Sequence, residues 1–361
     1  MNRQPYESPE RWWAPQLNPL VVRLMRPVRR RILRRGQGIV ELETAGVENL
    51  KAALADSSGV LITPNHSFHY DSYVLMQASD EVGRPFHFMT AWQVFAMSRW
   101  FDRWLLQKHG CFSVDRESAD LRAFRTGVEI LQSGEPLVVF PEGDVYHTND
   151  RVTPFRDGAA ALALSAAKRS ERRIVCVPCA LKTWYLDDPR SGMLELMTQL
   201  EESLHWRPRP DMPLVERVMR FAEGMLALKE IEYLGAPQEG SVPKRVRQLA
   251  ESILARLEQA RGMPVGTHHI PERVKELRRR AIKDREQPEL TPEAAERLDH
   301  EFEDLFFVIQ LYSYPGDYAV EKPSIERLAE TLDKFEEDVF RAVYPSIRGR
   351  RRAMVRFGPP M

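Results

Sequence analysis

Short apolar segments that end in polar residues constrain the fold of this chain most. Residues 60–63 form an apolar run that leads into His66, and residues 136–140 form a second run that leads into Glu142. Runs of about four to eight apolar residues bounded by glycine or proline are typical of buried strands. In open α/β sheets, ligands bind just beyond the carboxyl ends of such strands. The pattern therefore predicts a sheet with polar, reactive side chains along one edge.

The spacing of apolar residues divides the chain into parts. Strand and helix patterns alternate from residue 37 to residue 190, and we expect strands at 39–43, 60–63, 85–90, 110–114, 136–140 and 173–181. The helices expected between them cover residues 48–54, a segment that begins near residue 72, 91–108 and 117–132. Beyond residue 190 the patterns are helical, at 193–204, 214–233, 246–261, 272–285, 292–311 and 324–343.

These patterns predict an α/β fold whose largely parallel sheet is flanked by helices, with an N-terminal amphipathic arm and a large C-terminal helical region. We expect the arm at residues 1–36, the sheet domain at 37–190 and a helical accessory region at 191–350. A strand within residues 351–361 is expected to complete the sheet, because residues 354–360 resemble a late strand in the sheet of the family described below, and this would make the helical region an insertion.

His66 and Asp71 stand at the exit of the strand at 60–63, with four residues between them. A turn followed by a helix can bring this carboxylate and this imidazole together. A carboxylate bonded to one ring nitrogen fixes the tautomer, and the other nitrogen can then take a proton from a hydroxyl. The two residues are therefore candidates for a general base and its orienting partner. A surface histidine beside a helix-capping aspartate is the alternative interpretation.

Arg116 follows the strand expected at 110–114 and precedes a helix expected from residue 117. A guanidinium suits phosphate or carboxylate, and a helix N-terminus adds backbone donors for an anion. Arg116 is therefore a candidate for binding an anionic group of a substrate. A salt bridge to a neighbouring acid is the alternative interpretation.

Several short motifs together resemble those of a known family. They are Asn65-His66 with Asp71, Gly110-x-Phe112 with Arg116, Phe140-Pro141-Glu142-Gly143, Phe155-Arg156-Asp157-Gly158 and Val177-Pro178. In order and spacing they resemble the blocks of the phospholipid/glycerol acyltransferases, the 1-acyl-glycerol-3-phosphate acyltransferase superfamily, over about residues 37–182. The resemblance implies an enzyme of phospholipid biosynthesis that moves a fatty acyl group from a thioester to a hydroxyl of a glycerol-phosphate or lyso-lipid acceptor.

The resemblance also implies roles for individual residues. It makes His66 the base, Asp71 its orienting partner and Pro178 a shaper of the pocket. It also implies that Arg116 and Glu142 bind the acceptor. We further expect Gly143, Asp144 and Arg156 to bind the acceptor, from their positions beside these residues in the motifs. The donor would be acyl-CoA or an acyl carrier protein thioester, with no other cofactor and no metal.

The reaction itself explains which other groups are needed. The acceptor's own oxygen attacks the thioester, so no protein nucleophile is required, and the chain has no Gly-x-Ser-x-Gly motif. The oxyanion that forms needs hydrogen-bond donors, for which backbone amides near Gly143 are candidates.

The sequence departs from the family after Glu142-Gly143. Most members continue with threonine, arginine and serine, whereas here Asp144, Val145 and Tyr146 follow. A carboxylate at this position would repel a phosphate. We therefore expect an acceptor whose phosphate is absent or is held elsewhere, by Arg116 and Arg156. An Asp144 that points away and caps a turn is the alternative interpretation.

The N-terminal arm has the pattern of a helix that lies on an anionic membrane. Its apolar residues at helical spacing are Val21, Leu24, Met25, Val28 and Ile32, preceded by Trp12 and Trp13. Its arginines are Arg23, Arg26, Arg29, Arg30, Arg31, Arg34 and Arg35. We expect reversible peripheral binding to the inner face of a membrane, with Pro27 kinking or dividing the helix. An arm packed on the domain, with solvated arginines, is the alternative.

The rest of the composition narrows the compartment and the partners. The 52 basic and 52 acidic residues cancel, so no overall charge favours nucleic acid as a partner. Three cysteines cannot form a disulfide framework, the N-terminus resembles no signal peptide, and no apolar run is long enough to span a bilayer. A cytoplasmic protein on a membrane surface fits these features.

Other interpretations stay open. Cys176 and Cys179 have redox-motif spacing, but they lie within the strand expected at 173–181, where two buried thiols are small apolar residues. His66, His69 and Asp71 would suit a metal-dependent hydrolase. A non-catalytic membrane-binding scaffold with a relic site is the remaining alternative.

Overall fold

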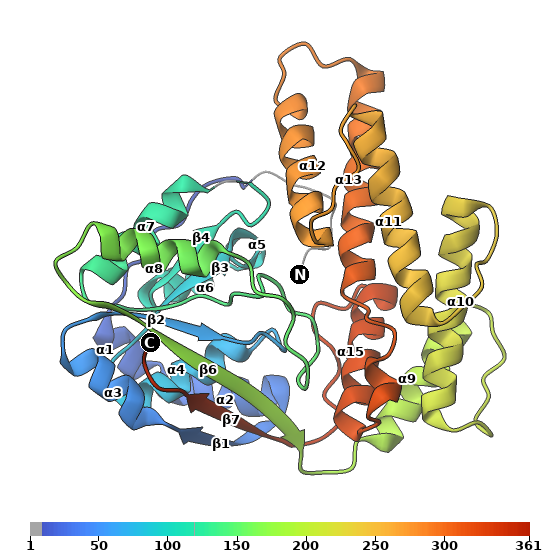
Figure 1. Cartoon of the computed structure of the whole chain (residues 1–361). Helices are drawn as coiled ribbons and strands as arrows, with labels where there is room; N and C mark the ends of the chain where they lie inside the picture. Colours follow the sequence, from blue (N-terminus) through green and yellow to red (C-terminus); the bar gives the residue numbers. More distant parts are fainter. Residues whose placement is uncertain (1–8, 119) are drawn as a thin grey trace. The chain divides into compact units, whose positions relative to one another are not determined.

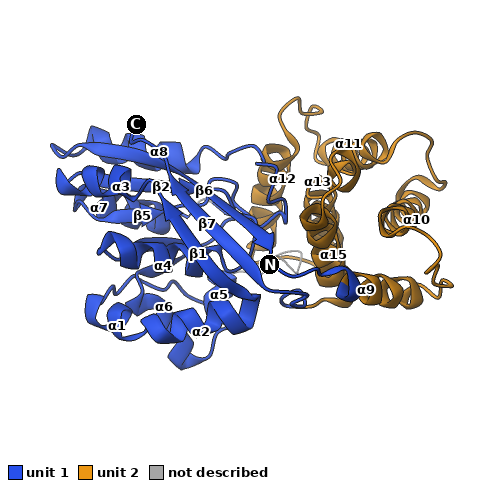
Figure 2. Cartoon of the chain, turned by 90° about the horizontal axis from the view of Figure 1, so that it is seen from below, with its two compact units in different colours: residues 1, 9–192, 343–361 blue, residues 2–8, 193–342 orange. Residues whose placement is uncertain are grey.

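The computed structural model describes residues 9–118 and 120–361. The chain divides into two compact units, one formed by residues 9–192 and 343–361 and the other by residues 193–342 (Figure 2). The first unit contains the sheet, and the described residues of the second unit form helices and loops. The expected fold class, an α/β fold with a mostly parallel sheet and a large C-terminal helical region, is confirmed.

The sheet has seven strands in the order β1-β7-β6-β2-β5-β3-β4 (Figure 1). Neighbouring strands are parallel except β6 and β7, which are antiparallel. Val60, Leu61 and Ile62 of β2 are fully buried, as expected for a central strand covered on both faces. The strands are β1 (Ile39–Ala45), β2 (Gly59–Pro64), β3 (His87–Ala91), β4 (Cys111–Val114), β5 (Pro136–Val138), β6 (Ile174–Tyr185) and β7 (Arg351–Phe357).

Helices cover both faces of the sheet. Leu50 of α3 and Leu75 of α4 share one core with Val60 and Ile62, whereas Leu131 of α7 shares the opposite core with Leu61. The alternation along β2 follows from the two-residue period of a strand. The helices of this unit are α1 (Pro19–Leu24), α2 (Arg26–Gln37), α3 (Val47–Ala55), α4 (Asp71–Val82), α5 (Trp92–Met97), α6 (Trp100–Lys108), α7 (Leu121–Gln132) and α8 (Gly158–Lys168).

Cys176 and Cys179 lie on opposite faces of β6. Side chains three residues apart in a strand point in opposite directions. Cys179 belongs to the core covered by α3 and α4, and Cys176 packs against the core covered by α7 and α8. Both thiols are free. They are therefore core residues rather than a redox pair.

Two helices of the first unit differ from the expected ones. The helix expected at 91–108 is broken between α5 and α6, where Ser98 and Arg99 adopt extended backbone and the Ser98 hydroxyl donates to the Val94 carbonyl at 2.6 Å. The helix expected from residue 117 begins only at Leu121. Arg116 therefore lies in the turn before α7 and not beside its N-terminus.

The capping of α7 explains this later start. The Asp120 carboxylate accepts a hydrogen bond from the Ala123 amide at 2.9 Å, which satisfies one of the unpaired amides in the first turn. Its other oxygen accepts from the Asp115 amide at 3.0 Å. Asp120 therefore holds the preceding residues in a turn instead of letting the helix continue toward Arg116.

The N-terminal arm packs one face on the first unit. Val22 and Leu33 are buried, and Trp13 stacks on Phe95 with ring centroids 5.3 Å apart. The expectation that Trp13 lies at a membrane interface is therefore wrong, because its indole is part of the protein core. The arm is divided between α1 and α2, with Pro27 in the first turn of α2, where its missing amide hydrogen costs no helical hydrogen bond.

Arg29 anchors the arm through a buried ion pair. Its Nη2 donates to both carboxylate oxygens of Asp80 on α4, at 3.0 and 2.9 Å. Its Nη1 donates to the Val22 carbonyl at 2.6 Å and to Nε2 of His109 at 2.9 Å. Arg26 reaches the same Asp80 carboxylate at 2.8 Å. Arg29 therefore serves the fold and is not part of a solvated face, and the partly exposed Arg26 supports the same ion pair.

The second unit packs seven helices around its own apolar cores and buried ion pairs. Arg217 and Glu201 are both only 1% exposed at their side chains and lie 2.7 Å apart, and Arg273 binds Glu258 at 2.8 Å. A buried charge without its oppositely charged partner is strongly destabilising. The helices must therefore pack so that each buried arginine meets its carboxylate. Its helices are α9 (Arg190–Ser203), α10 (Leu214–Leu234), α11 (Val242–Ala260), α12 (Ile270–Arg285), α13 (Pro292–Tyr312), α14 (Tyr318–Glu321) and α15 (Ile325–Phe340).

Replacing Asp80 with asparagine is expected to lower the free energy of unfolding by about 3 kcal/mol or more, because it leaves the Arg29 charge buried without an ionised partner. Urea denaturation measures this loss. Asp56→Asn, at the exposed end of α3, is the control and should change stability by less than about 0.5 kcal/mol. Equal stability of the two variants would contradict the anchoring role.

Candidate active site

The candidate site lies at the carboxyl ends of two neighbouring parallel strands. Ile62 of β2 pairs with Val138 of β5, and the Val139 amide extends the ladder by donating to the Ile62 carbonyl at 3.0 Å. His66 follows β2, and Glu142 follows β5. The sheet thus brings together two motifs that are 76 residues apart in sequence. This is the edge at which open α/β sheets bind ligands.

His66 and Asp71 form a hydrogen-bonded pair. Nδ1 of His66 lies 3.0 Å from Oδ2 of Asp71, whose side chain is only 4% exposed. The same oxygen accepts from the amides of Ser67 at 2.8 Å and Phe68 at 2.9 Å. An ionised carboxylate only accepts hydrogen bonds, so Nδ1 carries the proton and Nε2 keeps its lone pair. Asp71 also begins α4, where the helix dipole favours a negative charge.

The ring of His66 is held from a second side by Phe140. The two rings are stacked, with centroids 3.9 Å apart and an angle of 21° between the planes. Asn65 fixes the backbone just before His66, because its side-chain amide pairs with both backbone groups of Leu181 in β6, at 2.7 and 3.0 Å. The imidazole is therefore positioned by the exits of β2 and β5 and, through Asn65, by the interior of β6.

Glu142 is buried and joins two backbone segments. Oε1 accepts from the His66 amide at 2.7 Å, and Oε2 accepts from the Thr153 amide at 3.0 Å. The Thr153 hydroxyl donates to Oε2 as well. Glu142 is only 3% exposed. In this structure the carboxylate binds the protein's own backbone around His66, and its expected contact with an acceptor stays a prediction.

Arg116, Gly143 and Asp144 meet at the other end of the site. Nη1 of Arg116 donates to the Gly143 carbonyl at 2.8 Å and forms an ion pair with Oδ1 of Asp144 at 3.0 Å. Burial opposes ionisation of the Asp144 carboxyl, but attraction to Arg116 and Arg156 outweighs it and holds its pKa well below the usual range. Asp144 is therefore a carboxylate bound to an arginine, as the salt-bridge interpretation of Arg116 requires.

Arg156 covers Gly143. A Cβ atom at Gly143 would lie 2.5 Å from Nε and 2.8 Å from Cζ of Arg156, and the backbone there has φ +79°. Only glycine combines this left-handed conformation with so close an approach. The Arg156 amide donates to the Pro141 carbonyl at 2.8 Å, which fixes this arrangement. The structure thus brings Arg156 to the same end of the site as Arg116.

The amides considered as oxyanion donors already have acceptors. The Gly143 amide donates to the Phe140 carbonyl at 3.1 Å, and the Val145 amide donates to Oδ1 of Asp144 at 2.9 Å. The Tyr146 amide lies 3.4 Å from the His66 carbonyl. In the chain as it stands, these three amides hold the turn together.

Pro178 lies in β6 beside Thr63 of β2. Its ring packs on Gly358, where a Cβ atom would approach Cγ of Pro178 to 2.9 Å, and its carbonyl accepts from the Gly358 amide at 2.8 Å. These contacts tie β6 to the chain just after β7. A part for Pro178 in shaping a substrate pocket stays a prediction.

Two residues of the site were not anticipated from the sequence. Thr153 donates the hydrogen bonds that Oε2 of Glu142 accepts. The side-chain amide of Asn149 pairs with both backbone groups of Thr183 in β6, at 2.7 and 3.0 Å. Asn149 thus repeats, from the loop before α8, the contact that Asn65 makes with Leu181. The length of this loop, which runs from residue 139 to residue 157 without a helix or strand, was the available signal that it has partners of its own.

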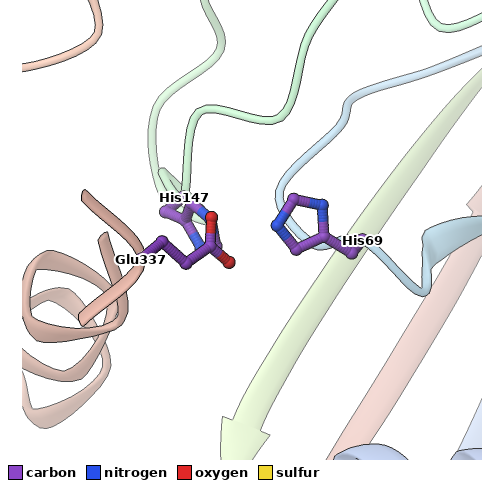
Figure 3. A group of neighbouring side chains, drawn as sticks. All are labelled: His69, His147 and Glu337. Atoms are coloured by element: carbon purple, nitrogen blue, oxygen red, sulfur yellow. The ribbon is translucent and has the colours of Figure 1, made fainter. Parts of the chain in front are cut away.

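His69 does not join His66 and Asp71. Its ring lies 5.3 Å from that of His147 and 5.8 Å from that of Tyr344 (Figure 3 shows the two histidines). The ring nitrogens of His69 and His147 come within 4.8 Å of each other. Among the described residues of the first unit, these imidazoles are two ligands, whereas a catalytic zinc site uses about three protein ligands. The alternative metal set of His66, His69 and Asp71 does not form a group of possible metal ligands among the described residues.

Comparison with protein families covers the part of the chain that carries this site. The family model described as acyltransferase matches residues 41–182, from β1 to β6. The matched segment includes His66, Asp71, Arg116 and Glu142. A comparison with curated proteins found no match. The matched segment points to acyl transfer as the general reaction.

Glu142→Gln is expected to reduce stability by about 1–3 kcal/mol, because the new amide group must face the His66 or Thr153 donor where a carboxylate oxygen accepted before. Urea denaturation measures this change. Glu135→Gln removes a half-exposed partner of Arg84 and should cost less than about 1 kcal/mol. A Glu142→Gln variant as stable as Glu135→Gln would rule out the bracing role.

Proposed function

We propose that this protein moves a fatty acyl group from a thioester donor to a hydroxyl of a lipid acceptor at a membrane surface, because residues 41–182 match the family model described as acyltransferase. The observation that carries the proposal is the His66–Asp71 pair, with Nδ1 and Oδ2 3.0 Å apart at the exit of β2. The donor is acyl-CoA or an acyl carrier protein thioester.

In the proposed reaction His66 acts as a general base. Nε2 takes the proton of the acceptor hydroxyl while the hydroxyl oxygen bonds to the thioester carbonyl carbon. The carbon–sulfur bond then breaks, and His66 returns the proton to the leaving thiolate. Asp71 stabilises the imidazolium that exists between the two proton transfers. An ester and a free thiol result, and no covalent enzyme intermediate forms.

Features of the site favour this function over the alternatives. A general base requires a buried carboxylate that fixes the tautomer of its histidine, and Asp71 does this for His66. A non-catalytic scaffold does not require such a pair. A hydrolase metal on His66, His69 and Asp71 would need these three side chains together, and they do not form such a group among the described residues. We therefore prefer acyl transfer to both.

His66→Ala is expected to lower the kcat of acyl transfer by roughly a hundredfold or more without unfolding the protein, since it removes the base. Asp71→Asn should also be severe, because an amide can donate to Nδ1 and favour the wrong tautomer. Transfer from labelled acyl-CoA or acyl carrier protein into lipid gives the rate, and circular dichroism checks the fold.

His300→Ala, at a side chain 70% exposed in the second unit, is the matched control and should act like the wild type. A folded His66→Ala protein with wild-type transfer would refute the assignment of the base. No transfer by any variant or by the wild type, with a range of lipid acceptors, would refute the proposed reaction.

Exposed apolar side chains of the first unit supply the proposed membrane contact. In α5 and α6 they are Met97, Trp100, Phe101 and Trp104, and in α1 and α2 they are Leu20, Leu24 and Val28. The end of α6 lies beside the start of α1, since the Asn18 amide donates to the Lys108 carbonyl at 2.9 Å. The exposed arginines of the arm are Arg23, Arg30, Arg31, Arg34 and Arg35.

This combination suits peripheral binding. Tryptophans and aliphatic side chains partition into the headgroup region, and each arginine near an anionic surface contributes about 1 kcal/mol. In the part of the chain that the structure describes, no helix is long and apolar enough to cross a membrane. The proposed membrane contact is therefore a surface one, made by α6 together with the arm.

Trp100→Ser/Trp104→Ser and Arg30→Gln/Arg34→Gln are each expected to weaken binding to phosphatidylglycerol vesicles by about tenfold or more. Point substitutions are preferred to removal of the arm, which would take Trp13 and Leu33 out of the core. Cosedimentation at low and high salt measures the binding, and only the arginine contribution should fall with salt.

Leu164→Ser, at an exposed leucine of α8, is the control for a general loss of apolar surface. The membrane proposal fails if wild type and all variants sediment equally with phosphatidylcholine and phosphatidylglycerol vesicles.

A further inference from the structure

A carboxylate of the chain itself lies against Arg116, the arginine expected from the sequence to bind an anionic group. Oδ1 of Asp144 lies 3.0 Å from Nη1 of Arg116, and the two side chains are only 14% and 17% exposed. The same Nη1 also donates to the Gly143 carbonyl at 2.8 Å. Nη1 of Arg116, which could bind an anion, is thus occupied by the Gly143 carbonyl and the Asp144 carboxylate.

The charges around this pair leave little attraction for a dianion. Arg156 is the second arginine here, held over Gly143 by close packing and by the hydrogen bond from its amide to Pro141. Two guanidinium groups and one carboxylate carry a single net positive charge. A phosphomonoester carries about 1.5 to 2 negative charges at pH 7. It would have to approach the Asp144 carboxylate or displace it from Arg116.

Displacement is unfavourable because Asp144 is built into its turn. Oδ1 also accepts from the Val145 amide at 2.9 Å, so leaving Arg116 would break a second hydrogen bond as well. A mostly buried carboxylate that loses its arginine is left without its compensating charge. Asp144 thus caps its turn and neutralises Arg116 at the same time, from a single side-chain position.

We propose that Asp144 excludes phosphomonoesters from the Arg116 end of the site, and that the acceptor is an uncharged hydroxyl-bearing lipid of the acylglycerol class. This inference rests on the proposed acyl transfer. It differs from it in assigning a specificity residue and an acceptor class, and its first test does not depend on turnover.

The first test measures binding of glycerol 3-phosphate by isothermal titration calorimetry. Asp144→Asn keeps the shape of the side chain and removes its charge, and it should bind on the order of tenfold more tightly than the wild type. Asp144→Thr is a second variant that should change binding in the same direction. Adding Arg116→Gln to Asp144→Asn should abolish the gain, which would place the phosphate at Arg116.

Asp188→Asn is the matched control, because it removes an exposed carboxylate that lies 2.9 Å from Arg190 in the same unit. Its affinity should equal that of the wild type. The proposal is overturned if the wild type binds glycerol 3-phosphate as tightly as both Asp144 variants do.

The second test compares kcat/KM for a 1-acylglycerol and for the corresponding 1-acylglycerol 3-phosphate in the same mixed micelles. The wild type should prefer the uncharged acceptor, and Asp144→Asn should shift the ratio toward the phosphate by about tenfold. A wild type that prefers the phosphate, with a ratio unchanged in both variants, overturns the proposal. If the wild type acylates neither lipid, the proposed acylglycerol acceptor class is overturned, and the calorimetric result alone supports or overturns the exclusion of phosphomonoesters by Asp144.

Discussion

The buried carboxylate of Glu142 is the contact on which the geometry of the site depends. Its two oxygens accept from the amides of His66 and Thr153, so one side chain joins the exits of β2 and β5 to the loop before α8. Burial of a carboxylate is unfavourable unless hydrogen-bond donors surround it. If one of these segments moved away, Glu142 would lose donors that its burial requires. Asp71 acts in the same way at shorter range, on the turn between β2 and α4. His66 is thus positioned by two carboxylates, one at its backbone and one at its ring.

The separation in sequence between two contacting residues explains which contacts of the site could be predicted. The strand at 60–63 is a local pattern, and so is the pairing of His66 with Asp71, which lies only five residues further along the chain at a helix start. The α/β class follows in the same way from periodicity, and it is confirmed. The partners of Glu142 could not be read from the sequence, because they depend on β2 and β5 being neighbours in the sheet. The same holds for Asn149, whose partner Thr183 lies in another strand.

The arm shows a different limit of sequence reasoning. Apolar residues on both sides of a helix do not tell which side meets the protein. In the structure Val22 and Leu33 face the core, while Leu24 and Val28 face outward. Arginine patterns are equally ambiguous, because Arg29 is buried against Asp80 and Arg30 beside it is exposed. One face of these helices can therefore pack on the protein core while another face of the same helices carries exposed apolar and basic side chains that suit a membrane surface.

The position of β7 in the sheet has a consequence for biosynthesis. β7 lies between β1 and β6 and is the strand neighbour of β1 in the sheet, yet it follows the whole second unit in the sequence. While the ribosome makes residues 193–342, β1 has no strand to pair with, and one edge of β6 is open. Unpaired edges of this kind invite pairing with other chains. The nascent first unit therefore passes through an incomplete state whose lifetime is set by the translation of the helical unit, and at that stage it has the greatest need of a chaperone.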